Sequence, residues 1–190
     1  MTLFVGLGNP GSQYEETRHN IGFKVINALL EEFGAREISK SAFYGTLFRT
    51  SSTLFLKPTT FMNHSGKSVL PVKQFFKIDL EDIIVIHDDI DLPFGAVRFK
   101  RGGGHGGHNG LRSIDAVIGK EYLRVRIGVG KPERKSQVAD YVLHDFNAEE
   151  KRCIDRLIAH VKEACKAILH EELNVVKSHY SLKSFRGECE

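Results

Sequence analysis

Four short stretches of the 190-residue sequence concentrate side chains that bind or transfer protons. They are GLGNPG with TRHN (residues 6–11 and 17–20), TTFMNHSG (59–66), HDDID (87–91) and GGGHGGHNG (102–110). Taken singly, each has an ordinary structural explanation, because Asn and Asp favour turns and helix caps. All four lie at predicted strand-to-loop junctions, where open α/β sheets place their sites. Together they favour one shared functional site.

The residue types in these stretches favour hydrolysis by water without a covalent intermediate. No G-x-S-x-G motif supplies a serine nucleophile, and the three cysteines lie outside the four stretches. A histidine can take a proton from water while a carboxylate holds its ring in the required tautomer. His19 precedes a predicted helix, and a helix N-terminus disfavours the imidazolium. We therefore expect His19 to be the base and Asp88 to be its partner.

Three asparagines, Asn9, Asn63 and Asn109, belong to the same stretches. Amide side chains both donate and accept hydrogen bonds, and they do not titrate. They suit the binding of a peptide-like carbonyl, the orientation of water and the stabilisation of a developing oxyanion.

A metal-dependent hydrolase is the main alternative. Carboxylates and imidazoles suit several divalent ions. The candidate ligands are His87, Asp88, Asp89, Asp91, His105 and His108. Neighbouring residues of a strand point to opposite faces, so His87 and Asp89 would oppose Asp88. Only part of the set can converge, and we expect no metal and no other cofactor.

The G-x-G-x-x-G spacing of GLGNPG raises a second alternative, a dinucleotide site. Such a site needs a helix that begins within the glycine turn, and an acidic residue about 20 residues later that ends a second strand. Here Pro10 occupies the turn and SQYEETRH follows before any helical periodicity. Glu31 and Glu32 stand at the right distance, but inside a predicted helix. The turn instead predicts that Asn9 is placed at the carboxyl end of the first strand.

Hydrophobic periodicity predicts the elements that carry these residues. Predicted strands cover residues 2–7, 43–50, 53–57, 82–88, 96–101 and 122–130. Predicted helices cover 20–33, 63 or 65 to 76, the residues before 118, and a long segment that begins with a capping box at Asn147 and Glu150. Strands alternate with helices, and no linker divides the chain. The fold class is therefore α/β: one domain over residues 1–190, with a twisted mixed sheet flanked by helices.

Composition indicates the cellular compartment in which the protein is expected. The sequence has no apolar run long enough to span a bilayer and no recognisable signal peptide. Its cysteines, Cys153, Cys165 and Cys189, are odd in number and irregularly spaced, which argues against a disulfide framework and fits a reducing cytoplasm. We expect a cytoplasmic protein without membrane contact.

Positive charge is concentrated in one segment. Residues 98–135 hold ten Lys or Arg and three Asp or Glu, whereas the whole chain has a net charge of +3. Such a segment is either a solvated face or an anion-binding surface, for which phosphate is the obvious partner.

The same stretches resemble bacterial peptidyl-tRNA hydrolases. The resemblance is carried by VGLGNPG with QYEETRHNIGF, LFLKPTTFMNHSGKSV, IVIHDDIDLPFGAVRFKRGGGHGGHNGLRSI and LRVRIGVGKP, and it covers most of residues 1–145. It implies a small monomeric α/β enzyme that needs no metal. Its expected substrate is peptidyl-tRNA, in which it would cleave the ester between the peptide and the terminal ribose, releasing the tRNA for reuse.

The resemblance also assigns expected roles residue by residue. His19 matches the catalytic base and Asp88 matches its partner. Substrate-binding positions are matched by Asn9, Tyr14, Met62, Asn63, His108 and Asn109, and residues implicated in tRNA contact by Lys100 and Arg126. Asp89 stands where glutamate is usual, and His64 where an apolar residue is usual.

A binding module without activity remains a third alternative, because the basic segment and the glycine-rich loop alone would fit RNA. The His19 and Asp88 pair distinguishes the two, since RNA binding does not require a base held by a carboxylate.

Overall fold

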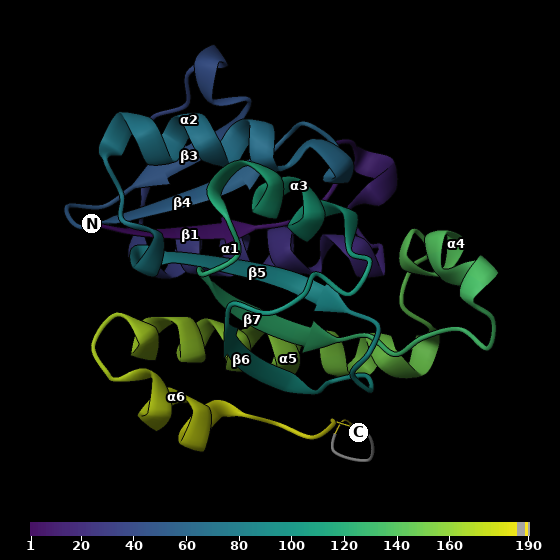
Figure 1. Ribbon diagram of the computed structural model, residues 1–190. Helices are drawn as coiled ribbons and strands as arrows, with labels where there is room; N and C mark the ends of the chain where they lie inside the picture. The colour runs from purple at the N-terminus through teal and green to yellow at the C-terminus, as the bar shows by residue number, and fades with distance from the viewer. Residues whose placement is uncertain (186–188, 190) are drawn as a thin grey trace.

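The protein is built on one mixed β-sheet (Figure 1). The computed structural model describes residues 1–185 and Cys189, and in these residues the sheet has seven strands in the order β2-β3-β4-β1-β5-β7-β6. The strands are β1 (Thr2–Gly6), β2 (Arg36–Glu37), β3 (Gly45–Arg49), β4 (Thr53–Pro58), β5 (Ile83–Asp89), β6 (Val97–Arg101) and β7 (Leu123–Gly128). Strands β1, β4, β5 and β7 run parallel, so their carboxyl ends share one edge.

Helices cover both faces of the sheet. One face carries α1 (Ile21–Phe33), α5 (Ala148–Ile168) and α6 (Leu173–Tyr180), and the other carries α2 (Gly66–Phe76) and α3 (Asn109–Ile118). The short helix α4 (Val138–Val142) lies beyond the arrowheads of β5 and β7 (Figure 1). The predicted α/β class with a mixed sheet flanked by helices is confirmed.

Strand β5 shows why the sheet is buried on both sides. Ile84 and Ile86 pack into the core beneath α1 and α5, whereas Ile83 and Val85 pack into the core beneath α2 and α3. A strand with two covered faces reads as a continuous apolar run, as this segment does. The same alternation sends consecutive residues at its carboxyl end, His87 and Asp88, to opposite faces.

The first turn explains the glycine spacing. After β1 the chain forms two short 3₁₀ turns, Ser12–Tyr14 and Arg18–Asn20, and α1 begins only at Ile21. A Cβ atom on Gly6 would collide with the carbonyl oxygen of Gly22 in α1, so this glycine permits close contact between strand and helix. The glycine turn leads into a 3₁₀ turn of three residues, and α1 begins only at Ile21, so the long helix of a dinucleotide site does not start within the glycine turn.

Most sequence predictions of elements hold to within a few residues. The capping box is present: Asn147 Oδ1 accepts from the Glu150 N–H at 2.8 Å, and Glu150 Oε1 accepts from the Asn147 N–H at 2.9 Å. Helix α2 continues through Pro71. Sequence analysis missed β2, α4 and α6.

One prediction about the cysteines needs correction. Cys153 on α5 and Cys189 form a disulfide, and Cys165 is a buried free thiol whose pKa is raised by burial. An odd number of cysteines excludes a fully paired framework but not a single bridge. The two residues are 36 positions apart and meet because the chain after α6 returns to α5, a contact that spacing does not reveal.

Within residues 1–185 and Cys189, no helix combines the length and the apolar character required to cross a bilayer.

Candidate active site

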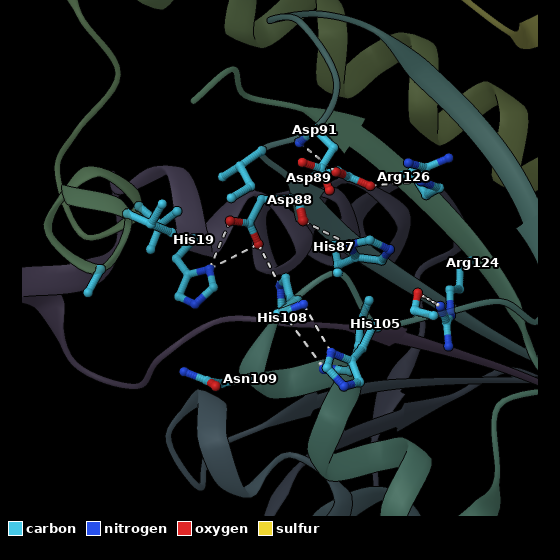
Figure 2. A pocket seen from close by; sticks show the side chains of 18 of the residues that line it. His19, His87, Asp88, Asp89, Asp91, His105, His108, Asn109, Arg124 and Arg126 are labelled. Atoms are coloured by element: carbon cyan, nitrogen blue, oxygen red, sulfur yellow. Dashed lines mark hydrogen bonds and ion pairs between the residues drawn. The ribbon is translucent and has the colours of Figure 1, made fainter. Parts of the chain in front are cut away.

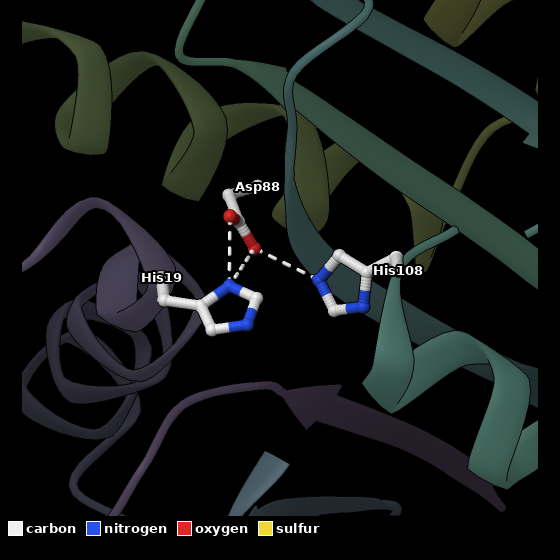
Figure 3. Close-up of side chains that lie close together, drawn as sticks. All are labelled: His19, Asp88 and His108. Carbon is white, nitrogen blue, oxygen red and sulfur yellow. Dashed lines mark hydrogen bonds and ion pairs between the residues drawn. The ribbon is translucent and has the colours of Figure 1, made fainter. Parts of the chain in front are cut away.

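His19 and Asp88 meet at the carboxyl edge of the sheet (Figure 3). His19 belongs to the 3₁₀ turn directly before α1, and Asp88 lies near the end of β5, on the face that α1 covers. The Nδ1 atom of His19 is 2.8 Å from one Asp88 carboxylate oxygen and 3.0 Å from the other. Because a carboxylate only accepts, Nδ1 carries a proton, and in the neutral ring Nε2 is the nitrogen that holds the lone pair. In the described part of the chain, no hydrogen bond occupies Nε2.

Asp88 is buried, and its surroundings favour the ionised form. Burial alone would raise the pKa of this carboxyl, but its electrostatic interactions and hydrogen bonds with His19 and His108 hold the pKa well below its usual range. Asp88 is therefore a fixed negative acceptor at neutral pH.

His108 is the second histidine on the same carboxylate. Its Nε2 donates to Asp88 Oδ1 at 2.8 Å, and its Nδ1 accepts from the N–H groups of Gly110 and Leu111 at 3.1 and 3.2 Å. His108 is thus the N-cap of α3, and the cap fixes its tautomer. Both ring nitrogens are occupied, unlike those of His19.

The pair opens onto a cavity of about 420 Å³. Figure 2 shows His19 and Asn109 on one side of Asp88, with Arg124 and Arg126 on the other. The rest of the lining combines the end of β5, the glycine-rich loop and α4. Of the residues singled out in the sequence, the lining includes His19, Asp88, Lys100, His108, Asn109 and Arg126.

Asn9 acts on the neighbouring turn and is absent from the cavity lining. Its Oδ1 accepts from the Met62 N–H at 2.7 Å, while its backbone N–H and carbonyl are held by the side chain of Asn20 at 2.9 Å. The buried side chain of Met62 in turn packs against Gly110, the second residue of α3, so tightly that a Cβ there would lie 2.6 Å from its sulfur. These contacts tie the first turn, the Met62 segment and α3 into one unit. The sequence analysis assigned no role to Asn20, although this residue directly follows His19 and its side chain holds the Asn9 backbone.

The other predicted residues are exposed or half-buried. Asn63 and His64 are exposed beside Met62, and Tyr14 is half-buried with its ring edge-on to Phe61. Tyr14 and Asn63 also lie outside the cavity lining. Asn109 is exposed, and its Oδ1 accepts from Arg112 at 3.2 Å. Since His64 points outward rather than into the core, its departure from an apolar residue does not disturb the packing around Met62.

The residue next to the pair, His87, has an unusual environment. Its Nδ1 donates to the Asp88 carbonyl at 2.8 Å, whereas Nε2 is buried and has no hydrogen-bond partner among the described residues. Burial, together with the nearby His108, lowers the pKa of His87 to about 4, so the ring is neutral. His87 also lines the cavity, on the opposite side of the strand from Asp88. Sequence analysis considered it only as a metal ligand.

Several basic residues of the 98–135 segment are structural. Arg124 is buried, pairs with Asp115 at 3.1 Å and donates to the Gly104 carbonyl at 2.6 Å, which anchors the glycine-rich loop. Arg126 pairs with Asp89 at 2.7 Å. Asp89, the other departure from the expected pattern, thus has a defined partner, and Lys100 is exposed at the cavity.

The metal alternative can be tested against the geometry. The donor atoms that converge are those of His19, Asp88 and His108, which lie within 4.8 Å of one another. A metal at His108 Nε2 would displace the proton to Nδ1, where two backbone N–H groups already donate. The cap of α3 therefore opposes ligation, and the cluster fits a proton-transfer site better than a metal centre.

Comparisons with known proteins identify the family of the chain. The family model described as Peptidyl-tRNA hydrolase matches residues 3–187. A peptidyl-tRNA hydrolase of Sulfurovum sp. is 77% identical over 187 residues, covering 98% of this chain and 99% of the relative. That of Sulfurimonas denitrificans is 56% identical over 183 residues, covering 96% and 98%. The crystal structure of peptidyl-tRNA hydrolase from Acinetobacter baumannii superposes with a TM-score of 0.91 at 37% identity, covering 97% of this chain and 96% of that one. The chain belongs to the peptidyl-tRNA hydrolase family.

Proposed function

We propose that this enzyme hydrolyses the ester of peptidyl-tRNA with a water molecule activated by His19 and Asp88. The observation that carries the proposal is the difference between the two nitrogens of His19. Nδ1 donates to a buried carboxylate, and Nε2, which holds the lone pair of the neutral ring, has no hydrogen bond to any described residue although His19 lines the cavity. This is the arrangement that a general base requires.

In the proposed reaction, Nε2 removes a proton from water as the water oxygen attacks the ester carbonyl carbon. The imidazolium that forms is stabilised by Asp88, which stays ionised. When the tetrahedral intermediate collapses, the bond from the carbonyl carbon to the ribose oxygen breaks, and Nε2 returns its proton to that oxygen. The products are a peptide with a free carboxylate and a tRNA with a free terminal hydroxyl.

The amide side chains supply binding in this proposal. Asn109 stands at the start of α3 inside the cavity, where its side chain can hold the carbonyl that gains negative charge. Asn63 and Tyr14, which lie outside the cavity lining, contact the parts of the substrate beyond the ester. Asn9, Met62 and His108 keep these groups in place through the contacts described above.

The tRNA partner is held by positive charge beside the cavity. Lys100 provides a free ammonium group for a phosphate, and Arg126 provides a second cation that Asp89 orients. We further propose that the enzyme acts in the cytoplasm as a monomer.

A purified, chelator-treated protein with a peptidyl-tRNA substrate tests this function. Release of peptide should continue at an unchanged rate after exhaustive chelation, and His19→Ala should abolish nearly all of it while tRNA binding persists. Loss of activity on chelation that one divalent ion restores would favour the metal mechanism. Binding of the tRNA without any cleavage by the wild-type protein would leave only an RNA-binding module.

A further inference from the structure

The residue directly before the base, Arg18, is a buried cation with several partners. Its side chain is 9% exposed, and one guanidinium nitrogen donates to Glu150 Oε1 at 3.1 Å. The other donates to the Tyr141 carbonyl at 3.0 Å, and the guanidinium carbon lies 3.9 Å from the centre of the Tyr141 ring. A planar guanidinium satisfies all three contacts at once, which an ammonium cannot do.

Tyr141 places Arg18 behind the wall of the cavity. In helix α4, Val138, Ala139 and Val142 line the cavity, while Tyr141 contacts Arg18. The Tyr141 hydroxyl donates to the Val129 carbonyl at 2.6 Å. This hydrogen bond holds the Tyr141 ring against the residue that follows β7. Arg18 therefore holds a helix of five residues that is too short to be stable alone.

Glu150 connects this contact to the rest of the fold. The same oxygen that accepts from Arg18 accepts from the Asn147 N–H in the capping box of α5. The backbone adds two contacts. The Arg18 N–H donates to the His144 carbonyl at 3.1 Å, and Thr17 forms an isolated antiparallel β-bridge with Asp145. The segment that carries His19 is thus joined through Thr17 and Arg18 to α4, to α5 and to the connection between them.

We propose that Arg18 is a positioning residue that fixes the distance between His19 and the apolar wall formed by α4. In the proposed mechanism the substrate ester lies next to His19, in the cavity that Val138, Ala139 and Val142 also line. A change of about 1 Å in this spacing is enough to lower a rate by a large factor. The inference rests on the proposed function of His19.

Arg18→Met tests the inference, because methionine fills the space without donors or charge. We expect kcat to fall about 10-fold, with a smaller change in KM, when measured well below the unfolding temperature. Hydrogen exchange of the amides in residues 138–142 should become faster in the same variant, because α4 loses its anchor. Arg18→Lys should recover only part of kcat, since it restores the ion pair but not the stacking on Tyr141.

Two further variants separate the contacts. Glu150→Gln keeps an oxygen for the Asn147 N–H but removes the charge, and we expect a kcat between those of wild type and Arg18→Met. Combined with Arg18→Met it should add little, because both changes break the same contact. Lys24→Met is the matched control, since it removes a solvent-exposed ion pair with Glu16 close to the same turn. It should leave kcat and exchange unchanged.

The outcomes distinguish this inference from the proposed function. If Arg18→Met lowers the unfolding temperature but keeps normal kcat and normal exchange at α4, Arg18 is only a structural residue and the inference is wrong. If His19→Ala retains activity, the proposed function itself fails, whatever Arg18 does.

Discussion

Asp88 receives hydrogen bonds from two histidines, and the regions that present them differ. His19 comes from an irregular turn before α1, and its Nε2 is unoccupied within the described residues. His108 comes from the first position outside α3, and its Nδ1 is occupied by two backbone N–H groups. Both rings lie against one carboxylate, with centres 5.0 Å apart. In the proposed mechanism, the base His19 differs from the structural His108 in its second ring nitrogen and not in its contact with the carboxylate.

This difference has a physical origin in the local backbone. The end of a helix leaves N–H groups that need an acceptor, and an imidazole at the N-cap is committed to them. A 3₁₀ turn of three residues makes no such demand on the His19 side chain. In the proposed mechanism the two histidines therefore have different functions: His19 transfers the proton, and His108 holds the Asp88 carboxylate in place.

The largest effect should come from His19→Ala. Loss of a general base usually costs about 10²–10⁴-fold in kcat, and tRNA affinity should change little. The wild-type kcat should fall at low pH as the ring protonates, and this limb should be absent in the variant. Single-turnover cleavage across a pH series measures both quantities. A variant with near-normal turnover at neutral pH would place the base elsewhere, and His108→Ala would then be the next test.

Asp88→Asn should lower kcat by roughly 10²-fold or more, because an amide can present its NH₂ to the ring and favour the wrong tautomer. The double variant with His19→Ala should be no slower than His19→Ala alone, since Asp88 acts through the base. Additive losses in this cycle would show that Asp88 has a function independent of His19.

A third histidine, His87, should make the stability of the protein depend on pH. The pKa of His87 is about 4 in the folded protein and 6.5 in an unfolded chain, so between these values only the unfolded state gains the proton. Stability should therefore fall as pH drops from 6.5 to 4, by about 3 kcal/mol at 1.36 kcal/mol per pKa unit. Asp88, whose pKa is lowered, should add a further loss only below its ordinary value of 3.8.

The measurement is urea unfolding of wild type and of His87→Phe at several pH values. The difference between the two free energies of unfolding should change between pH 6.5 and 4 and be flat above pH 7. Parallel curves across this range would mean that His87 takes up a proton in the folded state.

Particular residues show which features of the fold and the site could be predicted from the sequence. The run from Ile83 to Asp89 and the box at Asn147 are local signals, and both were predicted correctly. The resemblance linked His108 to the site, but its role as an N-cap was not apparent, because Asn109 and the glycines around it concealed where α3 begins.

Other features depend on partners distant in sequence. Helix α4 is one short turn that depends on Arg18, which is 123 residues away from the carbonyl it contacts. The pairing of Arg126 with Asp89 depends on the register of β5 and β7, and the bridge from Cys153 to Cys189 depends on the path of the chain after α6. No local pattern encodes such contacts.

His108→Asn should have a moderate effect. Asparagine is a good N-cap, so α3 should keep its start, but the hydrogen bond to Asp88 is lost. Since a hydrogen bond to a charged group contributes about 1.5–3 kcal/mol, we expect kcat to fall at least 10-fold, by less than in His19→Ala. His108→Ala, which loses the cap as well, should also lower the unfolding temperature. Equal losses of kcat in His108→Asn and His19→Ala would remove the distinction between the two histidines.

The smallest effect should come from substitution of the basic residues that are proposed to bind tRNA. The two residues, Lys100 and Arg126, differ in whether the side chain already has an acidic partner. Lys100 is exposed, whereas Arg126 is already paired with Asp89. If Lys100 neutralises one phosphate, Lys100→Ala should weaken tRNA binding a few-fold and reduce the slope of log affinity against log salt by about 1, with kcat unchanged. Arg126→Ala should reduce the slope less, because Asp89 partly cancels the charge of Arg126. The substitution also exposes the carboxylate of Asp89, which repels phosphate, and the double variant with Asp89→Asn should remove this repulsion.

Lys177→Ala is the control, since Lys177 on α6 is an exposed lysine outside the 98–135 segment. It should leave the slope as it is in wild type. An identical slope in Lys100→Ala and Lys177→Ala would mean that the basic segment is a solvated face rather than a binding surface.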